Sequence, residues 1–239
     1  MKQNGTLSNT QLNNLIDNIT PLDIDEVGDA HHSTSANTPL RADAFDLTDN
    51  AKIALIEGHF REIMNVLGLD LTDDSLAGTP QRVAKMYVKE IFSGLNPANK
   101  PKVALFDNKY KYGEMLVEKN IQFFSNCEHH FVPIYGMAHV AYISSGKVIG
   151  LSKINRIVQY FSKRPQVQER LTVQIAEELK VMLDTQDIAV VIDAKHMCVS
   201  TRGVQDTTSS TITAHYSGKF SDEKTKNEFL AHIYQQTNH

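Results

Sequence analysis

The sequence predicts an α+β fold in which an antiparallel sheet carries helices packed on one face. Apolar residues recur at helical spacing in two separate parts of the chain, before residue 95 and between residues 154 and 183. Alternating or β-branched patterns, which are typical of strands, dominate the part between them. The resulting order is helices, a strand hairpin, two helices, further strands and a closing helix, which is the order of an α+β protein.

Residues 1–50 are predicted to form a largely disordered extension. They are rich in Asn, Thr, Ser and Asp and show no sustained hydrophobic period. A short helix near Gln11–Ile19 is the one element we expect there, and the pair His31-His32 is expected to be solvated. The extension carries a charge balance of -6 within a formal net charge of -4, so the rest of the chain is mildly positive.

Residues 51–110 form a predicted helical region with two helices. The first has apolar residues on one face and a glycine stop: Ile53, Ile56, Phe60, Ile63, Leu67 and Gly68. The second has clear boundaries, because Thr79 suits the N-cap, Pro80 suits the first helical position and Gly94 follows its end.

Residues 111–239 form the main predicted domain. Its expected strands and helices are Glu114–Phe124, Val132–Ser144, Lys147–Leu151, Ile154–Phe161, Val167–Leu183, Ile188–Ala194, Thr207–His215 and Asp222–Gln235, of which the fourth, fifth and last are helices. Ser145-Gly146 suits a tight turn, so we expect the second and third strands to pair as a hairpin. A sheet covered on one face has to bury the other, which predicts assembly with further subunits.

Composition excludes several classes of protein. No apolar run approaches the roughly 18–20 residues of a membrane span, and the amino terminus lacks the pattern of a secretory signal. We therefore expect a cytoplasmic protein that binds no membrane. The mild positive charge of residues 51–239 also predicts no nucleic-acid binding, which usually needs a strongly basic stripe.

The residues that indicate chemistry are Cys127-Glu128-His129-His130, directly after a predicted strand, and the distant His196-Met197-Cys198. Residues i and i+2 of a strand point to the same side, so His196 and Cys198 are expected to face one site. Two thiolates and one imidazole suit zinc and leave one position for water, whose pKa the metal lowers. Two further histidines then remain for proton transfer.

Taken alone, each of these Cys and His residues also has a purely structural interpretation. A single Cys is more often a small core residue, and a single His is usually a hydrogen-bonded polar group. We interpret the isolated His59, His139 and His215 in this way. The His-x-Glu and Pro-Cys-x-x-Cys patterns of zinc deaminases are absent, as is the His-Glu-x-x-His pattern of zinc peptidases. A purely structural zinc module is a further alternative, but such sites normally use four protein ligands.

Several motifs, in order along the chain, resemble those of the GTP cyclohydrolase I family. They are Thr79–Ala84, Asn126–Phe131, Gly150–Arg156, Arg164–Arg170, His196–Cys198 and Arg202–Val204. The resemblance runs from about residue 51 to the end of the chain and makes residues 111–239 the catalytic domain, of the kind called a T-fold.

This resemblance implies a zinc-dependent hydrolase that opens the guanine ring of GTP at C8. The implied products are formate and 7,8-dihydroneopterin triphosphate, in the first step of tetrahydrofolate and pterin biosynthesis. The implied zinc ligands are Cys127, His130 and Cys198, and the implied proton carriers are His129 and His196. The implied substrate-binding residues are Glu169 and Gln168 at the guanine and Ser152, Lys153, Arg156, Arg202 and Arg82 at the sugar and triphosphate.

The resemblance also implies a ring of five subunits whose sheets close into a barrel, with two rings stacked into a decamer. Sites of this family lie between subunits.

Two other enzymes of the same superfamily fit the sequence less well. The nitrile reductase of queuosine synthesis uses a catalytic Cys without zinc. Pyruvoyl-tetrahydropterin synthase binds zinc through three histidines, a trio that this sequence does not suggest.

Overall fold

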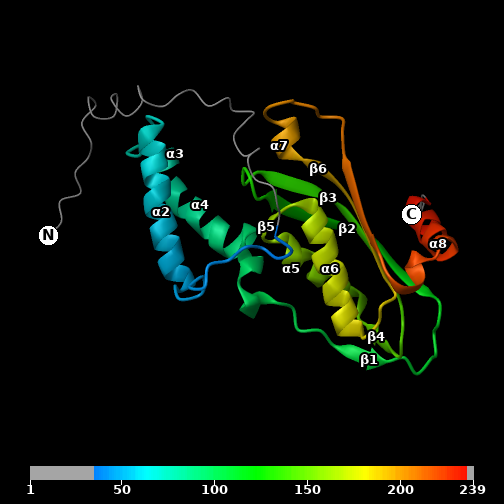
Figure 1. Cartoon of the computed structure of the whole chain (residues 1–239). Helices are drawn as coiled ribbons and strands as arrows, with labels where there is room; N and C mark the ends of the chain where they lie inside the picture. The colour runs from blue at the N-terminus through cyan, green and yellow to red at the C-terminus, as the bar shows by residue number, and fades with distance from the viewer. Residues whose placement is uncertain (1–34, 236–239) are drawn as a thin grey trace. The chain divides into compact units, whose positions relative to one another are not determined.

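The computed structural model describes residues 35–235 (Figure 1). The predicted helix at Gln11–Ile19, the pair His31-His32 and most of the predicted extension lie outside these residues. The described helices are α2 (Asp49–Val66), α3 (Asp74–Ala77), α4 (Thr79–Met86), α5 (Leu151–Ser162), α6 (Gln168–Leu183), α7 (Met197–Ser200) and α8 (Glu223–Tyr234). The strands are β1 (Leu105–Asp107), β2 (Met115–Cys127), β3 (Pro133–Ile143), β4 (Lys147–Ile149), β5 (Pro165–Gln166), β6 (Ile188–His196) and β7 (Thr211–Tyr216). None of the described helices is both long and apolar enough to span a membrane.

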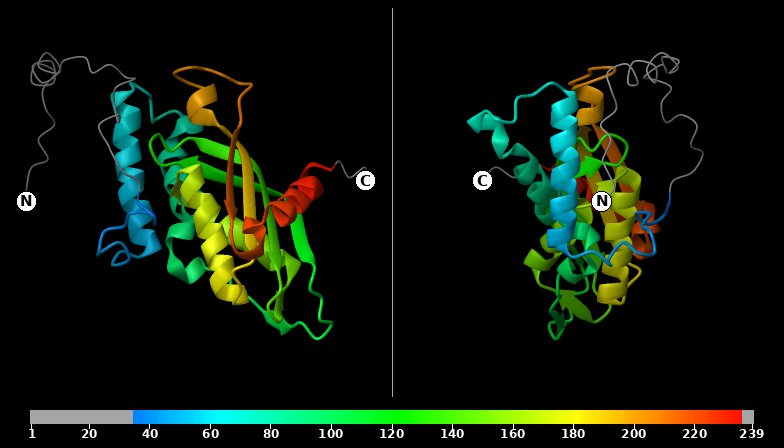
Figure 2. Two further views of the ribbon diagram at one scale, coloured as in Figure 1. Left: turned by 45° about the vertical axis from the view of Figure 1, so that its right-hand side comes forward. Right: turned by 90° about the vertical axis from the view of Figure 1, so that its left-hand side faces the viewer.

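The two predicted N-terminal helices are present and pack against each other (Figure 2). Helix α2 begins after Thr48, whose hydroxyl accepts a hydrogen bond from the backbone N–H of Ala51. The predicted cap of the second helix is wrong, because Gly78 occupies the N-cap position of α4 and Thr79 is the first helical residue. The Gly78 carbonyl already accepts the N–H of Arg82, so the helical hydrogen-bond ladder starts one residue earlier than predicted.

The main sheet has five strands in the order β5-β2-β3-β6-β7. All neighbouring pairs are antiparallel except the short β5, which runs parallel to the end of β2. The register places Asn126 opposite Pro133 and Ile134 opposite His196. The end of β2, the start of β3 and the end of β6 therefore meet at one end of the sheet.

The predicted hairpin between β3 and β4 is wrong. Strand β4 turns away after Gly146 and pairs antiparallel with β1, with Phe106 opposite Val148. Strand β3 is unavailable to β4 because β2 and β6 already occupy its two edges. A good turn sequence fixes where the chain reverses, whereas the free edge decides which strand it joins.

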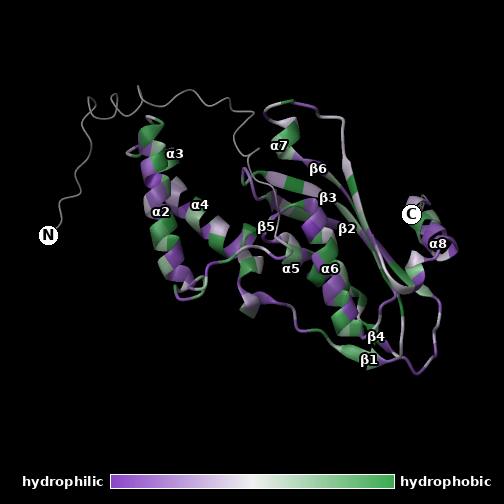
Figure 3. Ribbon diagram, in the orientation of Figure 1, coloured by the Kyte–Doolittle hydropathy of each residue, from purple (hydrophilic) through white to green (hydrophobic). Residues whose placement is uncertain are grey.

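The core forms on both faces of the sheet. Helices α5 and α6 pack on one face, where Phe123, Val140 and Ile192 meet Ile157 and Leu179. Alternate residues such as Ala141 and Val191 point to the opposite face, where α8 packs through Phe229 and Ile233 (Figure 2). Apolar and polar residues alternate along α6 and α8 (Figure 3), as expected for helices packed through one side. The predicted α+β fold with an antiparallel sheet is confirmed, and α8 adds cover at one end of the other face.

Candidate metal centre and active site

Three residues that suit a metal converge where β2, β3 and β6 meet. Cys127 ends β2, His130 lies in the next turn and Cys198 lies in α7. One ligand atom from each residue lies within 4.8 Å of the others. Cys127 is buried, Cys198 is half-buried and His130 is exposed, so the group opens toward solvent on the histidine side.

The donor set fits a zinc ion. Thiolate and imidazole are the ligands zinc prefers, and three of them leave one coordination position open. Arg202 Nη1 lies 3.0 Å from His130 Nε2, and because a guanidinium only donates, Nε2 is the acceptor of this hydrogen bond. Burial and the neighbouring Cys127 raise the pKa of the Cys198 thiol, so a cation at this position would be needed to hold the Cys198 sulfur as a thiolate.

Cys198 reaches the group by a different route from the one predicted. Strand β6 ends at His196, and Cys198 belongs to the single helical turn of α7. The predicted placement of Cys198 on one strand with His196 is therefore wrong, although Cys198 still joins Cys127 and His130. The helical turn separates the two side chains, and His196 Nε2 instead lies 2.7 Å from Gln168 Oε1.

The turn that carries His129 and His130 is closed by its own backbone. The Phe131 N–H donates to the Cys127 carbonyl at 2.8 Å, and the Cys127 N–H donates to the Val132 carbonyl at 2.9 Å. Phe131 adopts a left-handed conformation, with φ of 55°, and its carbonyl accepts a hydrogen bond from the Asn126 side chain. These contacts fix the path of the chain between the two ligands of the turn.

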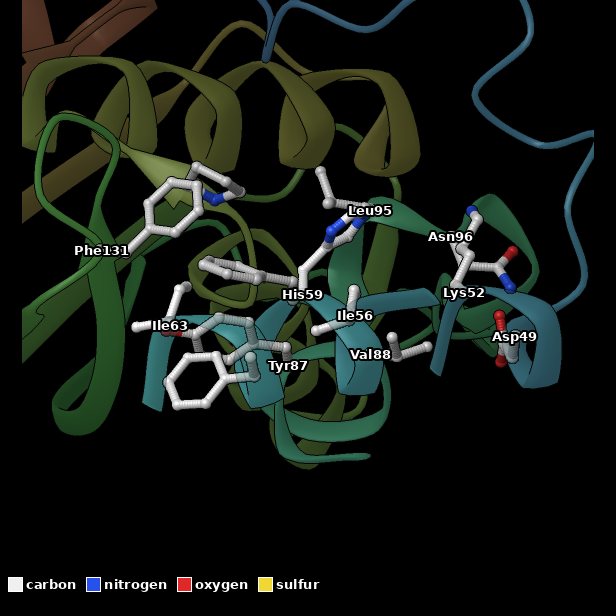
Figure 4. Close-up of a pocket in the computed structure, with 13 residues that line it drawn as sticks. Asp49, Lys52, Ile56, His59, Ile63, Tyr87, Val88, Leu95, Asn96 and Phe131 are labelled. Atoms are coloured by element: carbon white, nitrogen blue, oxygen red, sulfur yellow. The ribbon is translucent and has the colours of Figure 1, made fainter. Parts of the chain in front are cut away.

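Phe131 also anchors this turn on the N-terminal helical region. Its ring lies 5.0 Å from that of Phe92 and 6.4 Å from that of Tyr87. The three rings line a cavity of about 570 Å³ between α2 and the residues after α4 (Figure 4). The remaining lining is mainly apolar, and none of the predicted site residues lies in it. This cavity is therefore separate from the metal group, and Phe131 connects the two.

Gln168 is fully engaged inside the subunit. Its amide nitrogen donates to the carbonyls of Ile192 and Thr211 and to the Thr213 hydroxyl at 2.8–3.2 Å, and its oxygen faces His196. The residue is 2% exposed. Gln168 is thus tied to His196, and its predicted role beside Glu169 at the guanine stays a prediction. Burial lowers the pKa of His196, and the nearby Glu169 carboxylate opposes that shift.

The other predicted substrate-binding residues fall into two groups. Glu169 is exposed beside Gln168 at the start of α6, and Arg202 contacts His130, so both belong to the metal end of the sheet. Ser152, Lys153 and Arg156 lie on the first turns of α5, which follows β4 at the opposite end (Figure 1). The 11 residues of β3 separate these ends by roughly 30 Å.

Arg82 is exposed on α4. Among residues 35–235, no hydrogen bond or ion pair joins Arg82, Ser152, Lys153 or Arg156 to the metal group. The remaining predicted proton carrier, His129, is exposed, and its Nδ1 lies 3.7 Å from the Cys127 sulfur.

Glu128 and Arg170 are site residues to which sequence reasoning gave no role. They form an ion pair directly beside Cys127, with Arg170 almost completely buried. Both residues lie inside motifs that carry the family resemblance. The sequence contained one sign of this role. Arg170 is a charged residue next to the apolar stripe of α6, where a charged side chain is normally solvated.

Comparison with known proteins points to the same family as the sequence motifs. The model of a family described as GTP cyclohydrolase I matches residues 56–234. A protein of Flavobacterium johnsoniae named GTP cyclohydrolase 1 is 64% identical over 210 residues, which cover 88% of this chain and 94% of that protein. Proteins of the same name from Erwinia tasmaniensis and Aeromonas hydrophila are 56% and 58% identical and cover 82% and 81% of this chain and 89% and 88% of their own lengths. A solved structure of an archaeosine synthase in the apo form aligns with 45% of this chain and 97% of its own at 18% identity and a TM-score of 0.39.

Proposed function

Because this chain belongs to the GTP cyclohydrolase I family, we propose that Cys127, His130 and Cys198 bind zinc in a site that hydrolyses GTP at guanine C8. The products are formate and 7,8-dihydroneopterin triphosphate. The observation that carries the assignment of this site is the approach of three zinc-type ligand atoms to within 4.8 Å, from two motifs of the family that lie far apart in the sequence. When bound, zinc supplies a Lewis acid that lowers the pKa of a coordinated water toward neutrality.

His196 is proposed as one proton carrier, and the hydrogen bond that it donates to Gln168 supports a defined role for it. The amide nitrogen of Gln168 faces three acceptors, so its oxygen faces His196. An amide oxygen only accepts, which places the imidazole proton on Nε2 and leaves Nδ1 with a lone pair. His196 is therefore oriented to take a proton at Nδ1. His129, beside Cys127, is proposed as the second carrier.

Glu169 is proposed to recognise the guanine base. It is exposed at the start of α6, between Gln168 and Arg170, and its carboxylate has two oxygens for the N1–H and the exocyclic amine. Arg202 lies beside His130 and is suited to the triphosphate, because guanidinium groups bind phosphate oxygens through paired donors.

Ser152, Lys153, Arg156 and Arg82 are proposed to complete the site of a neighbouring subunit. For Ser152, Lys153 and Arg156 the position of α5 at the far end of the sheet supports this, because their side chains are too distant from the metal group of their own chain. Within the described residues, the outer edge of β7 and most of the outer edge of β2 are unpaired. Pairing β2 of one subunit with β7 of the next would close five sheets into a ring, and two stacked rings would give a homodecamer.

A reducing compartment suits this site, because both cysteines must stay free to bind the metal. We therefore also propose that the enzyme works in the cytoplasm.

The function is tested by incubating the purified, zinc-loaded protein with GTP. We expect formate in equal amounts with a product that becomes fluorescent on oxidation, as pterins do. A chelator should abolish both signals, and added zinc should restore them. A zinc-loaded, assembled protein that releases no formate would contradict the proposal and would favour a structural zinc site.

A further inference from the structure

Arg170 and Glu128 form a two-pronged ion pair beside the metal group. Arg170 Nη1 lies 2.5 Å from Glu128 Oε2, and Arg170 Nη2 lies 3.1 Å from Glu128 Oε1. The third nitrogen, Nε, donates to the Ser35 carbonyl at 2.8 Å. The Arg170 side chain is 3% exposed and that of Glu128 is 19% exposed. The guanidinium is therefore held on all its sides and has little freedom to move.

Glu128 is the residue between a proposed ligand and a proposed proton carrier, Cys127 and His129. Its backbone N–H donates to the Gln166 carbonyl at 3.0 Å, and Cys127 pairs with Gln166 in the parallel ladder of β2 and β5. Strand β5 leads directly into α6, where Arg170 is the third residue. The metal-ligating turn is thus attached to the start of α6 by its main chain and by the Glu128 side chain.

We propose that Arg170 is a positioning residue that fixes the metal-ligating turn through Glu128. The forked contact sets both the distance and the orientation of the Glu128 carboxylate, which a single ammonium group cannot do. Glu128 in turn holds the backbone that presents Cys127 and His130 to Cys198. This inference rests on the proposed zinc site and concerns how that site retains its metal.

A purely structural ion pair would have a different consequence. It would stabilise the packing of β2 against α6, and its loss would lower the melting temperature without a specific effect on the metal. A pair that positions ligands raises metal affinity, and removal of such an outer contact typically weakens binding about 10- to 100-fold. Metal retention, compared at equal loss of stability, separates the two roles.

The experiment uses zinc-loaded wild-type protein and four variants, Arg170→Met, Arg170→Lys, Glu128→Gln and Leu179→Ala. Each is mixed with an excess of a chromophoric chelator, and the rate of zinc transfer is recorded together with the melting temperature. Leu179 is the control, because it is fully buried on the same helix but lies among the apolar residues under the sheet. Its truncation lowers stability without touching the Glu128 contact.

We expect Arg170→Met and Glu128→Gln to release zinc at least about 10-fold faster than the wild type. Arg170→Lys, which keeps the charge but loses the fork, should fall between them and the wild type. Leu179→Ala should melt earlier yet release zinc within about twofold of the wild-type rate. If Arg170→Met does not fold, Glu128→Gln decides the question in the same assay.

The inference is overturned if the Arg170 and Glu128 variants release zinc no faster than Leu179→Ala at a comparable loss of melting temperature. The pair would then only stabilise the fold, and the proposed function would stand. A wild-type protein that retains no zinc would instead refute the metal centre and the positioning role together.

Discussion

The side-chain oxygen of Gln168 lies 2.7 Å from Nε2 of His196, which joins the first residue of α6 to the last residue of β6. Three acceptors surround the Gln168 amide nitrogen at 2.8–3.2 Å and fix the direction of that oxygen. The orientation of His196 therefore depends on a residue that is itself buried.

Gln168→Leu should lower kcat for formate release by about 100-fold, because a misplaced catalytic group can cost that much. The zinc content should stay at the wild-type level, since Gln168 contacts no proposed ligand. Gln174→Leu is the control, because it removes another buried amide of α6 whose partner is Gln166. Equal kcat values for the wild type and Gln168→Leu would show that His196 needs no such support.

Cys127→Ser, Cys198→Ser and His130→Ala should each lose zinc and activity together. Each change removes one of the three proposed ligands, whose atoms lie within 4.8 Å of one another. Elemental analysis after gel filtration measures the bound zinc, and formate release measures the activity. Full zinc occupancy in any of the three variants would remove that residue from the ligand set.

His129→Ala and His196→Ala should retain zinc but lose formate release. Both residues are proposed as proton carriers, and their loss should cost about 100- to 10,000-fold in rate. Zinc analysis and the formate assay are carried out on the same samples. A metal-free His129→Ala combined with a zinc-loaded His130→Ala would mean that the ligand and the proton carrier are exchanged within the turn.

Stability should fall on acidification partly because of His139 on β3. Burial lowers the pKa of His139 below its ordinary 6.5; Lys119 acts in the same direction, and Asp193 opposes it. Between the folded and unfolded pKa values the unfolded chain binds more protons, so the free energy of unfolding decreases as pH falls from about 6.5. The neutral ring is also needed, because Nδ1 accepts the backbone N–H of Asn120.

The measurement is the urea midpoint at pH 7.5 and at pH 5.5 for the wild type and for His139→Gln. Glutamine keeps an acceptor but does not titrate, so the variant should lose less stability between the two pH values. His196 and His215 also have pKa values lowered by burial, and their contributions cancel in this comparison. An identical loss in both proteins would exclude His139 as an acid-sensitive group.

The assembly should contain about ten subunits of 26.8 kDa, or roughly 270 kDa by light scattering. Co-expression of two inactive chains, Cys127→Ser and Arg156→Ala, should restore part of the activity, because their defects lie at opposite ends of the sheet and so in different halves of a shared site. Cys127→Ser with Glu169→Ala is the matched control and should stay inactive, since both residues lie at the metal end. A fully active monomer would contradict the shared site.

The sequence by itself determined the features that depend on neighbouring residues. Periodic apolar residues predicted α2, α5 and α6 to within a few residues, because helical and strand patterns are local. The run Cys127-Glu128-His129-His130 indicated a metal centre, because four such residues in succession have few other uses. The distant run His196-Met197-Cys198 added the second thiol, and the resemblance then assigned His130 as the third ligand. The structure brings Cys127, His130 and Cys198 together.

Only the tertiary structure decided which segments meet. Strand β4 pairs with β1 because β3 has no free edge, a fact that no turn sequence contains. Cys198 approaches Cys127 from a helical turn, so the strand alternation that was used to place it did not apply. Gln168 with His196 and Arg170 with Glu128 are separated by 28 and 42 positions. A local pattern gives the face on which a side chain lies, whereas its partner is set by the packing of α6 against the strand ends.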